Sequence, residues 1–423
     1  MSLADDMLVE QLPEGWEKKK LSKIILNFKR GPFGSAIKKE FFVVNGYKVY
    51  EQRNAIYKSS SIGSYYINDH KFTELKAFEV LPRDFIVSCS GTIGRIYQIP
   101  EHAPEGVINQ ALLRLRIDYN IVDETFFYFL FESDFFQSHI IKSSKGVAIK
   151  NMASVKEMKE VEVPIPPLPV QQQIVSKIEQ LFSELDSAIL LLHQLKQKMK
   201  LYRQSILKAA FLGKLTGSYV EGDVLPEGWV VEPLDKLCII ERGSSPRPIE
   251  KYITNGVGVN WIKIGDTKYH TKYLYNTKEK ITFDGAKKSR YVRVGDLIIS
   301  NSMSFGKPYI MKIDGYIHDG WFVLRLNQDV DTEYLYYSFM SPTVNAQINI
   351  LATGSVVKNI RSDLLKVVMI ILPPLPVQQQ IVSKIEQLFS VCDELEITID
   401  SNIKKSELLK QSILKHAFSG KLI

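Results

Sequence analysis

Basic side chains alternate with tyrosines in two stretches of this chain, and side chains of these types suit nucleic acid. Residues 263–275 mix lysines and a histidine with tyrosines, and residues 47–58 repeat the mixture with an arginine and an asparagine. Lysine and arginine neutralise phosphates, whereas arginine, asparagine, glutamine and serine read base edges in the major groove. A solvated strand-and-loop surface has a similar composition, but the recurrence of the mixture favours a nucleic-acid surface.

Further polar side chains lie in glycine-bearing loops and in a Lys-Asn pair that occurs twice, at 150–151 and at 358–359. Together with the two stretches they make up the candidate DNA contacts, each of which is basic or forms hydrogen bonds. In the first half these are Arg53, Asn54, Lys58, Ser90, Thr92, Arg95, Lys145, Lys150 and Asn151. In the second half they are Arg247, Lys263, Lys268, Lys272, Ser302, Ser304, Lys307, Lys358 and Asn359.

The short motifs of common enzyme chemistry are missing from the sequence. There is no GxGxxG, GxxxxGK[ST] or HExxH, and no Asp/Asn-Pro-Pro-Tyr of the amino-methyltransferase kind. The seven histidines are scattered without metal or triad spacing. Asp314, His318 and Asp319 are close in sequence, but a surface turn before a strand at Trp321 explains them better than a catalytic cluster. We therefore predict no catalytic residue, no metal site and no cofactor bound by this chain.

The composition is that of a globular protein with more than one domain. The chain has 423 residues, of which 45% are hydrophobic and 24% charged, and this length exceeds one ordinary core. No apolar run approaches the roughly 20 residues of a membrane span. The acidic N-terminus and three widely spaced cysteines (Cys89, Cys238 and Cys392) predict a cytoplasmic location. The net charge of +7 is compatible with nucleic acid.

A duplication organises the chain. Residues 166–183 recur unchanged at 373–390, an offset of 207 residues, and residues 204–211 recur at 411–418 with one change. The parts between them match only at short anchors, and the loops between the anchors differ in length. Two constant segments and two divergent ones are the pattern expected of domains that read different targets.

Each constant segment predicts a long helix. It begins after a proline-rich run and ends before Gly213 or Gly420 as a C-cap. It carries apolar residues at alternating spacings of 4 and 3 from Ile174 or Ile381, with the second stripe interrupted by Asn402 and Ser406 as register-setting polar residues can do. The spacing predicts a coiled-coil seam, and about 40 helical residues make a rod of roughly 60 Å. The alternative is a core helix of its own domain. Four flanking residues are predicted to dock partner helices: Val175, Phe182, Val382 and Phe389.

The divergent parts read as mixtures of strands and helices. Short β-rich runs at 85–88, 111–117, 297–300 and 321–326 are separated by glycine-bearing loops. An aromatic helix is expected near the end of each part, at 125–140 and 333–348, with its rings used for packing rather than for base stacking. The predicted fold class is α+β. It comprises mixed α/β domains at 13–165 and 226–372, joined by long helices within 166–215 and 373–423.

This layout resembles the DNA specificity subunit of type I restriction–modification systems. The resemblance rests on Pro-Pro-Leu-Pro-Val-Gln-Gln-Gln-Ile-Val at 166–175 and 373–382, and on Gly-Pro-Phe-Gly-Ser at 31–35. It also rests on the run 84–94 (Asp-Phe-Ile-Val-Ser with Gly-Thr-Ile-Gly), whose partner is 296–306. The second copy departs from the pattern at 302–306, where Ser-Met-Ser-Phe-Gly stands.

The resemblance implies a function. Each mixed domain would be a target recognition domain that reads half of a split site in double-stranded DNA. The two helices would pack antiparallel, giving a pseudo-two-fold repeat, and hold the domains apart. Two modification subunits would bring S-adenosylmethionine for adenine N6-methylation, and restriction subunits would use ATP and Mg²⁺ for translocation and cleavage. This chain would catalyse nothing and contact no membrane.

Three alternatives remain open at this point. A coiled-coil scaffold with protein-binding ends would lack the salt-dependent DNA affinity of a phosphate-contacting protein. A self-contained nuclease or methyltransferase is disfavoured by the absent motifs. A spare specificity module that exchanges half-sites by recombination would have the same biochemistry as the DNA specificity subunit that we favour.

Overall fold

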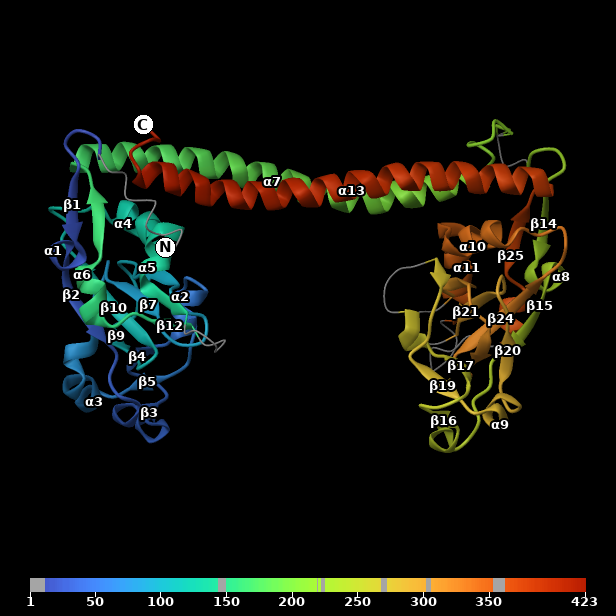
Figure 1. Cartoon of the computed structure of the whole chain (residues 1–423), viewed down its shortest axis with the longest axis horizontal. Coiled ribbons are helices and arrows are strands. Elements are labelled where there is room, and N and C mark those ends of the chain that lie inside the picture. The colour runs from blue at the N-terminus through green and yellow to red at the C-terminus, as the bar shows by residue number, and fades with distance from the viewer. Residues whose placement is uncertain are drawn as a thin grey trace. The chain divides into compact units, whose positions relative to one another are not determined.

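The computed structural model describes residues 12–143, 150–218, 220–221, 225–267, 272–301, 306–352 and 362–423. The chain divides into two compact units (Figure 1). Unit 1 comprises Met1–Leu192 and Ser401–Ile423, and unit 2 comprises His193–Asp400. Each unit holds one mixed domain and parts of two 44-residue helices, α7 (Leu168–Phe211) and α13 (Leu375–Phe418). The predicted fold class is confirmed.

Two sheets form the domain of unit 1. In the antiparallel first sheet the strands follow the order β2 (Ile25–Arg30), β10 (Leu112–Ile117), β7 (Phe85–Ser88) and β8 (Ile96–Gln98). The second sheet has the order β3 (Phe42–Val43), β5 (Tyr66–Ile67), β4 (Tyr47–Tyr50), β9 (Gly106–Ile108) and β6 (Glu79–Val80), and its pair β4–β9 is parallel. The remaining strand pairs are β1 (Glu17–Lys20) with β13 (Glu162–Ile165), and β11 (Ile141–Ser143) with β12 (Lys150–Met152).

Unit 2 repeats this topology. Its first sheet has the order β15 (Cys238–Arg242), β24 (Trp321–Leu326), β21 (Leu297–Ser300) and β22 (Pro308–Met311), with β18 (Tyr273–Leu274) added at one edge. Its second sheet has the order β16 (Ile253–Thr254), β19 (Glu279–Ile281), β17 (Val259–Ile262), β23 (Gly315–Ile317) and β20 (Arg290–Val292), and β17–β23 is parallel. Strand β14 (Val230–Pro233) pairs with β25 (Met369–Leu372). The duplication therefore extends through both domains, beyond the short anchors that the sequences share.

Strand β7 is apolar over Phe85–Val87 because both of its faces are covered. In β7, Phe85 and Val87 lie in the core that includes the aromatic helix, whereas Ile86 lies in a second core with Tyr50. Successive side chains of a strand point to opposite faces, so a strand between two cores has no polar face. All four predicted β-rich runs are strands within a residue of the expected bounds.

A buried aspartate precedes the central strand in each domain. The Asp84 carboxylate accepts two hydrogen bonds from Arg116, with Nε–Oδ1 and Nη2–Oδ2 distances of 2.7 Å, and one from the backbone of Leu81 at 2.8 Å. Asp296 accepts a hydrogen bond from Arg325 at 3.4 Å in the second domain. These contacts give the shared Asp of the two runs a structural role, since a buried carboxylate needs such partners.

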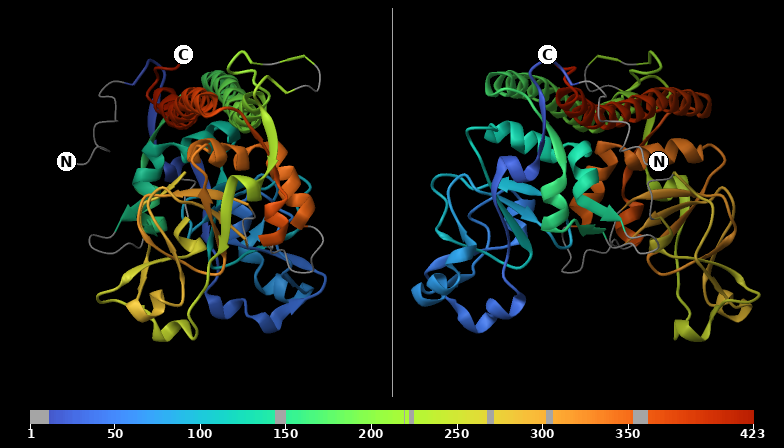
Figure 2. Two further views of the ribbon diagram at one scale, coloured as in Figure 1. Left: turned by 90° about the vertical axis from the view of Figure 1, so that its right-hand side faces the viewer. Right: turned by 60° about the vertical axis from the view of Figure 1, so that its left-hand side comes forward.

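Each aromatic segment is two helices rather than the single helix that was predicted. Ser133 ends one helix and caps the next, since its hydroxyl accepts from the backbone of Phe136 at 3.3 Å, and Ser341 does the same in unit 2. These helices lie between the first sheet and the long helices (Figure 2). Their bounds are α4 (Glu124–Glu132), α5 (Asp134–Ile140), α10 (Thr332–Met340) and α11 (Pro342–Ala352). Phe126, Phe127 and Tyr334 are fully buried, which confirms the packing interpretation.

Short helices complete the two domains. Those of unit 1 are α1 (Leu21–Ile24), α2 (Gln52–Ile56), α3 (Asp69–Glu74) and α6 (Val155–Glu160). Those of unit 2 are α8 (Leu234–Leu237), α9 (Phe283–Ala286) and α12 (Ser362–Lys366).

The two long helices are antiparallel within each unit. In unit 1 the start of α7 (Ile174, Ile178) shares a core with the end of α13 (Ile413, Phe418). In unit 2 the end of α7 and the start of α13 share a core in the same way. The same cores contain domain residues, so each domain packs against both helices, and the seam and the domain-core interpretations each hold in part.

Charged pairs and caps also repeat between the helices. Lys410 pairs with Asp186 at 2.5 Å in unit 1, and Arg203 pairs with Asp393 at 2.6 Å in unit 2, at positions related by the 207-residue offset. The predicted C-cap glycines have positive φ, 75° at Gly213 and 70° at Gly420.

Candidate DNA interface and its helical anchors

Three of the candidate DNA contacts lie together on one exposed loop. Ser90, Thr92 and Arg95 are exposed between β7 and β8. The buried Ser88 closes this loop, because its hydroxyl donates to the carbonyl of Thr92 at 2.6 Å and accepts from the backbone N–H of Arg95 at 3.0 Å. The loop borders a hollow of about 410 Å³ that Gln411 of α13 also lines. Its backbone is held in place while its polar side chains face solvent, as a base-contacting loop requires.

The three candidates around α2 have different surroundings. Asn54 is fully buried: its carbonyl accepts from the backbone of Glu51 at 2.8 Å, and its amide donates to two backbone carbonyls, of Ser59 at 2.8 Å and Ile62 at 2.7 Å. A side chain with every polar group engaged has nothing left for a base, so Asn54 is a structural residue. Arg53 is partly exposed and paired with Glu51.

Lys58 is tied to α4. Its ammonium contacts the Tyr128 hydroxyl and lies 3.4 Å from the Glu132 carboxylate. Burial alone would lower the pKa of Lys58, but these two groups outweigh it and the pKa is raised. Lys58 is thus charged, and about half of its side chain is exposed to solvent, where it could meet a DNA phosphate.

The Lys272 side chain is largely covered, contrary to its proposed role in contacting DNA. Only 13% of its side chain is exposed, and its ammonium pairs with Glu333 of α10 and, at 2.6 Å, with Glu386 of α13. It also lies 4.5 Å from the centre of the Tyr337 ring. Burial lowers the pKa of Lys272. The residue links the second domain to the long helix, and its charge is neutralised by these carboxylates.

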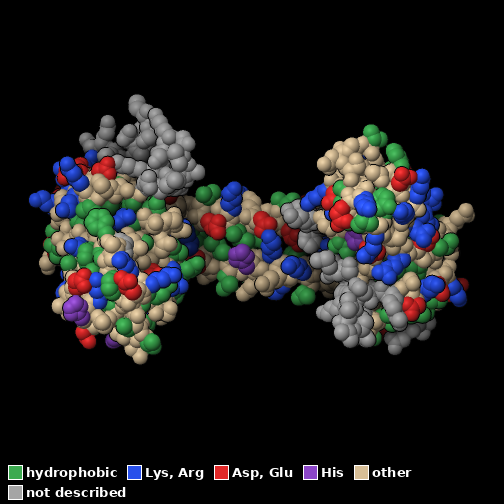
Figure 3. Space-filling view, turned by 90° about the horizontal axis from the view of Figure 1, so that it is seen from below, with side chains coloured by type: hydrophobic (Ala, Val, Ile, Leu, Met, Phe, Trp, Pro, Cys, Tyr) green, Lys and Arg blue, Asp and Glu red, His purple; other side chains and the backbone are tan. Residues whose placement is uncertain are grey.

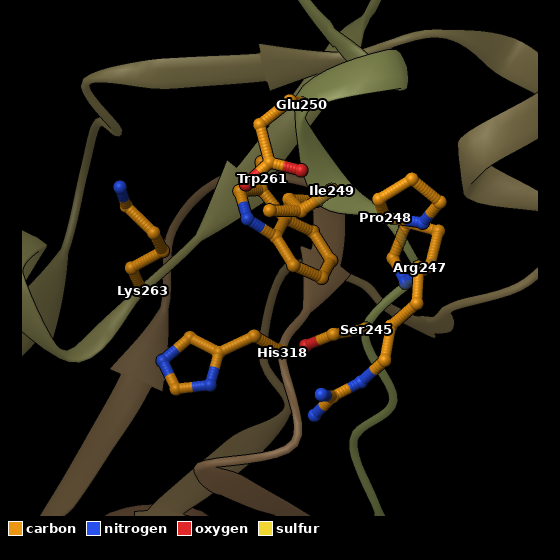
Figure 4. A pocket seen from close by; sticks show the side chains of 9 residues that line it. Ser245, Arg247, Pro248, Ile249, Glu250, Trp261, Lys263 and His318 are labelled. Carbon is orange, nitrogen blue, oxygen red and sulfur yellow. The ribbon is translucent and has the colours of Figure 1, made fainter.

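A hollow of about 750 Å³ in the second domain brings two other candidates together (Figure 4). Arg247 and Lys263 line it, with Trp261 and Ile249 as apolar wall and His318 at one side. Lys263 pairs with Glu279, and Arg247 pairs with Asp319 at 3.3 Å. Basic groups beside an apolar surface suit the edge of a base next to a phosphate.

His318 lines this hollow, and Asp319 pairs with Arg247 at its rim. Both ring nitrogens of His318 lie against backbone N–H groups, Nδ1 at 2.7 Å from Gly320 N and Nε2 at 3.1 Å from Ile264 N. Burial lowers the pKa of the His318 imidazole, which keeps the ring neutral. The structural interpretation of this segment therefore agrees with its contacts.

For the other candidate DNA contacts the structure gives less detail. Lys307 follows Gly306 and lies 5.5 Å from the centre of the Tyr309 ring. Lys150 and Asn151 belong to β12. Six candidates fall outside the described residues, namely Lys145, Lys268, Ser302, Ser304, Lys358 and Asn359. On the face in Figure 3, basic side chains of each unit are interspersed with acidic ones, so this face carries no uniform basic patch over the described residues.

The four predicted docking residues pack against other parts of the chain. The Phe182 ring packs edge-on against Phe129 of α4 at 5.6 Å, and the Phe389 ring packs in the same way against Tyr337 of α10 at 5.8 Å. Val382 is only 9% exposed, and Val175 packs against the core of unit 1. The chain's own domains cover part of these side chains, and their docking of partner helices stays a prediction.

Two residues that the motif search did not single out hold the domains on the helices. Gln171 is fully buried at the start of α7, where its amide accepts from the backbone of Asp123 at 2.7 Å and donates to the carbonyls of Ile121 and Pro166. Gln378 makes the equivalent three bonds in unit 2, starting with Asp331 at 2.8 Å. In the sequence, the Gln-Gln-Gln that both repeats keep unchanged is the feature that could have identified these two residues.

The described part of the chain holds no cluster of three or more metal-ligating side chains. Within the same residues, no helix is both long enough and apolar enough to cross a membrane.

Comparison with known families agrees with this geometry. The family model of the type I restriction modification DNA specificity domain matches residues 13–198 and 226–405, one copy for each half of the duplication. The chain belongs to this family.

Individual relatives support the same assignment. The chain is 25% identical to the EcoBI specificity subunit of Escherichia coli over 82% of its own length and 75% of the relative's. The crystal structure of the HsdS subunit from Thermoanaerobacter tengcongensis covers 98% of the chain and 99% of its own, with a TM-score of 0.61 and 20% identity. A chain from a structure of type I R-M complex assembly and conformational transition matches 97% of this chain and 99% of its own, with a TM-score of 0.68 and 21% identity. At these identities the structures support the fold.

Proposed function

We propose that this chain catalyses no reaction itself and directs partner subunits to a bipartite site in double-stranded DNA. One observation carries the proposal: two domains share one strand order and one attachment to the helices, but differ in the loops that expose polar side chains. Constant attachment with variable loops is expected where two readers with different targets serve one assembly. The target recognition domains would be 13–165 and 226–372, and the helical spacer segments 166–215 and 373–423.

The partners would supply the chemistry. Two modification subunits would bind S-adenosylmethionine and methylate adenine at N6, and restriction subunits would use ATP and Mg²⁺. The three free cysteines are all buried, which agrees with a reducing cytoplasm.

The set of proposed DNA contacts is smaller than the set expected from the sequence. Asn54 and Lys272 leave the set because their polar groups are engaged within the chain. Of the described residues, the set retains Arg53, Lys58, Ser90, Thr92, Arg95, Arg247, Lys263 and Lys307, together with Lys150 and Asn151 of β12. The six candidates outside the described residues stay predictions.

We propose a further docking surface for modification subunits at other positions of the two long helices. Leu201 and Leu408 occupy equivalent positions of the repeat and are 69% and 62% exposed, and Leu190 and Ile397 form a second exposed pair. Large apolar side chains that face water on a helix are typical of interaction sites when they recur. Their recurrence at the 207-residue offset suits two identical partner subunits.

Methylome sequencing tests the function. Cells that express this chain with its modification subunit are expected to carry N6-methyladenine in a split motif with a constant gap. A chimera with residues 226–372 from another member of the family should change one half of that motif and keep the other half. A continuous motif, or a chimera that changes both halves, contradicts the proposal. The purified chain with S-adenosylmethionine alone should transfer no methyl group.

A further inference from the structure

The loop after the first strand of the main sheet leaves that sheet at the same point in both domains. Gly31 donates its N–H to Leu112 at 2.9 Å, and Gly243 donates to Trp321 at 2.8 Å. A Cβ on Gly31 would lie 1.8 Å from the carbonyl oxygen of Asn109, and one on Gly243 would lie 2.1 Å from that of His318. Only glycine permits this close approach, so the two loops start from equivalent positions.

The residues after these glycines differ completely between the copies. The first loop continues Pro-Phe-Gly-Ser at 32–35, and the second continues Ser-Ser-Pro-Arg-Pro at 244–248. In a protein whose two domains read different sequences, side chains that set the target belong where equivalent loops diverge. The second loop carries one such side chain, Arg247, at the rim of the 750 Å³ hollow.

Arg247 is both exposed and oriented. Its side chain is 80% exposed, and its Nη2 donates to Oδ2 of Asp319 at 3.3 Å. Asp319 is held in turn, because Oδ1 accepts from the Ser245 hydroxyl at 2.7 Å and its carbonyl accepts from Asn301 at 2.9 Å. A guanidinium fixed at one nitrogen loses less conformational freedom on binding, while the rest of its planar fork stays available.

The ion pair of Arg247 with Asp319 persists at neutral pH. Burial would raise the pKa of the Asp319 carboxyl, but the Ser245 hydroxyl and nearby positive charge outweigh it, and the pKa is lowered. The carboxylate therefore stays ionised at neutral pH and can orient Arg247.

We propose that Arg247 reads a guanine in the half-site bound by the second recognition domain, donating two hydrogen bonds to O6 and N7 in the major groove. This inference rests on the proposed function. Arginine is the side chain whose fork matches those two acceptors. Asp319 is a positioning residue, and the apolar wall of Trp261 and Ile249 lies beside the base.

The test is Arg247→Lys, which keeps the positive charge and removes the fork. Methylome sequencing with the modification subunit should show one position of the second half-site relaxed from guanine, with a roughly 10- to 100-fold loss of preference there. The first half-site should be unchanged, which also shows that the variant is folded. Asp319→Asn should weaken preference at the same position.

Arg293→Lys is the matched control in the same domain, because Arg293 is 68% exposed and paired with Asp296 at 3.6 Å outside the hollow. It should leave the motif unchanged. A uniform loss of methylation at all positions would assign Arg247 to a phosphate and overturn the inference. So would a wild-type second half-site without a G·C pair, or an unchanged motif in Arg247→Lys. A wild type without any split motif would instead overturn the proposed function, and this inference with it.

Discussion

The buried amide of Gln378 should contribute several times more to stability than the exposed amide beside it. Gln378→Met keeps the length of the side chain and removes three hydrogen bonds, to the backbone groups of Asp331, Asp329 and Pro373. At about 1 kcal/mol for each bond, the substitution should cost about 3 kcal/mol of unfolding free energy, and more if the Asp331 N–H remains dry. For a unit of this size that is a fall of roughly 6–12 °C in the unfolding midpoint.

The chain supplies its own control for this experiment. Gln379 follows in the same repeated motif and is exposed, so Gln379→Met should leave the midpoint within about 1 °C, as surface substitutions do. Tryptophan fluorescence is a suitable assay, because Trp229, Trp261 and Trp321 all lie buried in unit 2. Equal midpoints for the two variants would refute the reasoning that the first glutamine of the motif anchors the domain.

Three further predictions follow from the helices and the buried aromatic side chains. Leu201→Asp combined with Leu408→Asp should abolish co-purification with a modification subunit and leave the unfolding midpoint unchanged; retained binding would place the docking surface elsewhere. Arg203→Asp should cost about 0.2–1 kcal/mol, measured by urea unfolding, and adding Asp393→Arg should restore most of it; no recovery would show that the pair contributes nothing. Burial raises the pKa of Tyr336 to about 12. The unfolded chain therefore loses this proton near pH 10, whereas the folded chain keeps it. The stability that is present below pH 10 falls as the pH rises towards 12. Tyr336→Phe should flatten that fall in a series of unfolding midpoints from pH 9 to about 12, and an equally steep fall would contradict the assignment.

Local patterns in the sequence were sufficient for the two long helices and for four strands of the main sheets. The heptad spacing and the terminal glycines located both long helices, and the apolar runs located four central strands, because helix and strand periodicity is a property of neighbouring residues. The one error of this kind was the break at Ser133 and Ser341, where a serine that caps a helix resembles any polar residue within one.

The placement of individual polar side chains depended on contacts between distant parts of the chain. Lys272 and Arg247 are alike in sequence, each a basic residue in a polar loop. Lys272 meets Glu386, 114 residues away, and is neutralised, whereas Arg247 stays 80% exposed beside Asp319.

The sequence by itself determined the duplication, the fold class and the two long helices, since repetition and periodicity survive without coordinates. The antiparallel packing of the helices was an expectation that came from the family resemblance. Only the tertiary structure decided which residues hold the domains on the helices and which polar side chains stay exposed. Exposure and hydrogen-bond satisfaction are set by partners that folding brings together from far along the chain. For that reason the side chains of Asn54 and Lys272 are engaged within the chain, Gln171 and Gln378 anchor the domains, and Arg247 stays exposed beside Asp319.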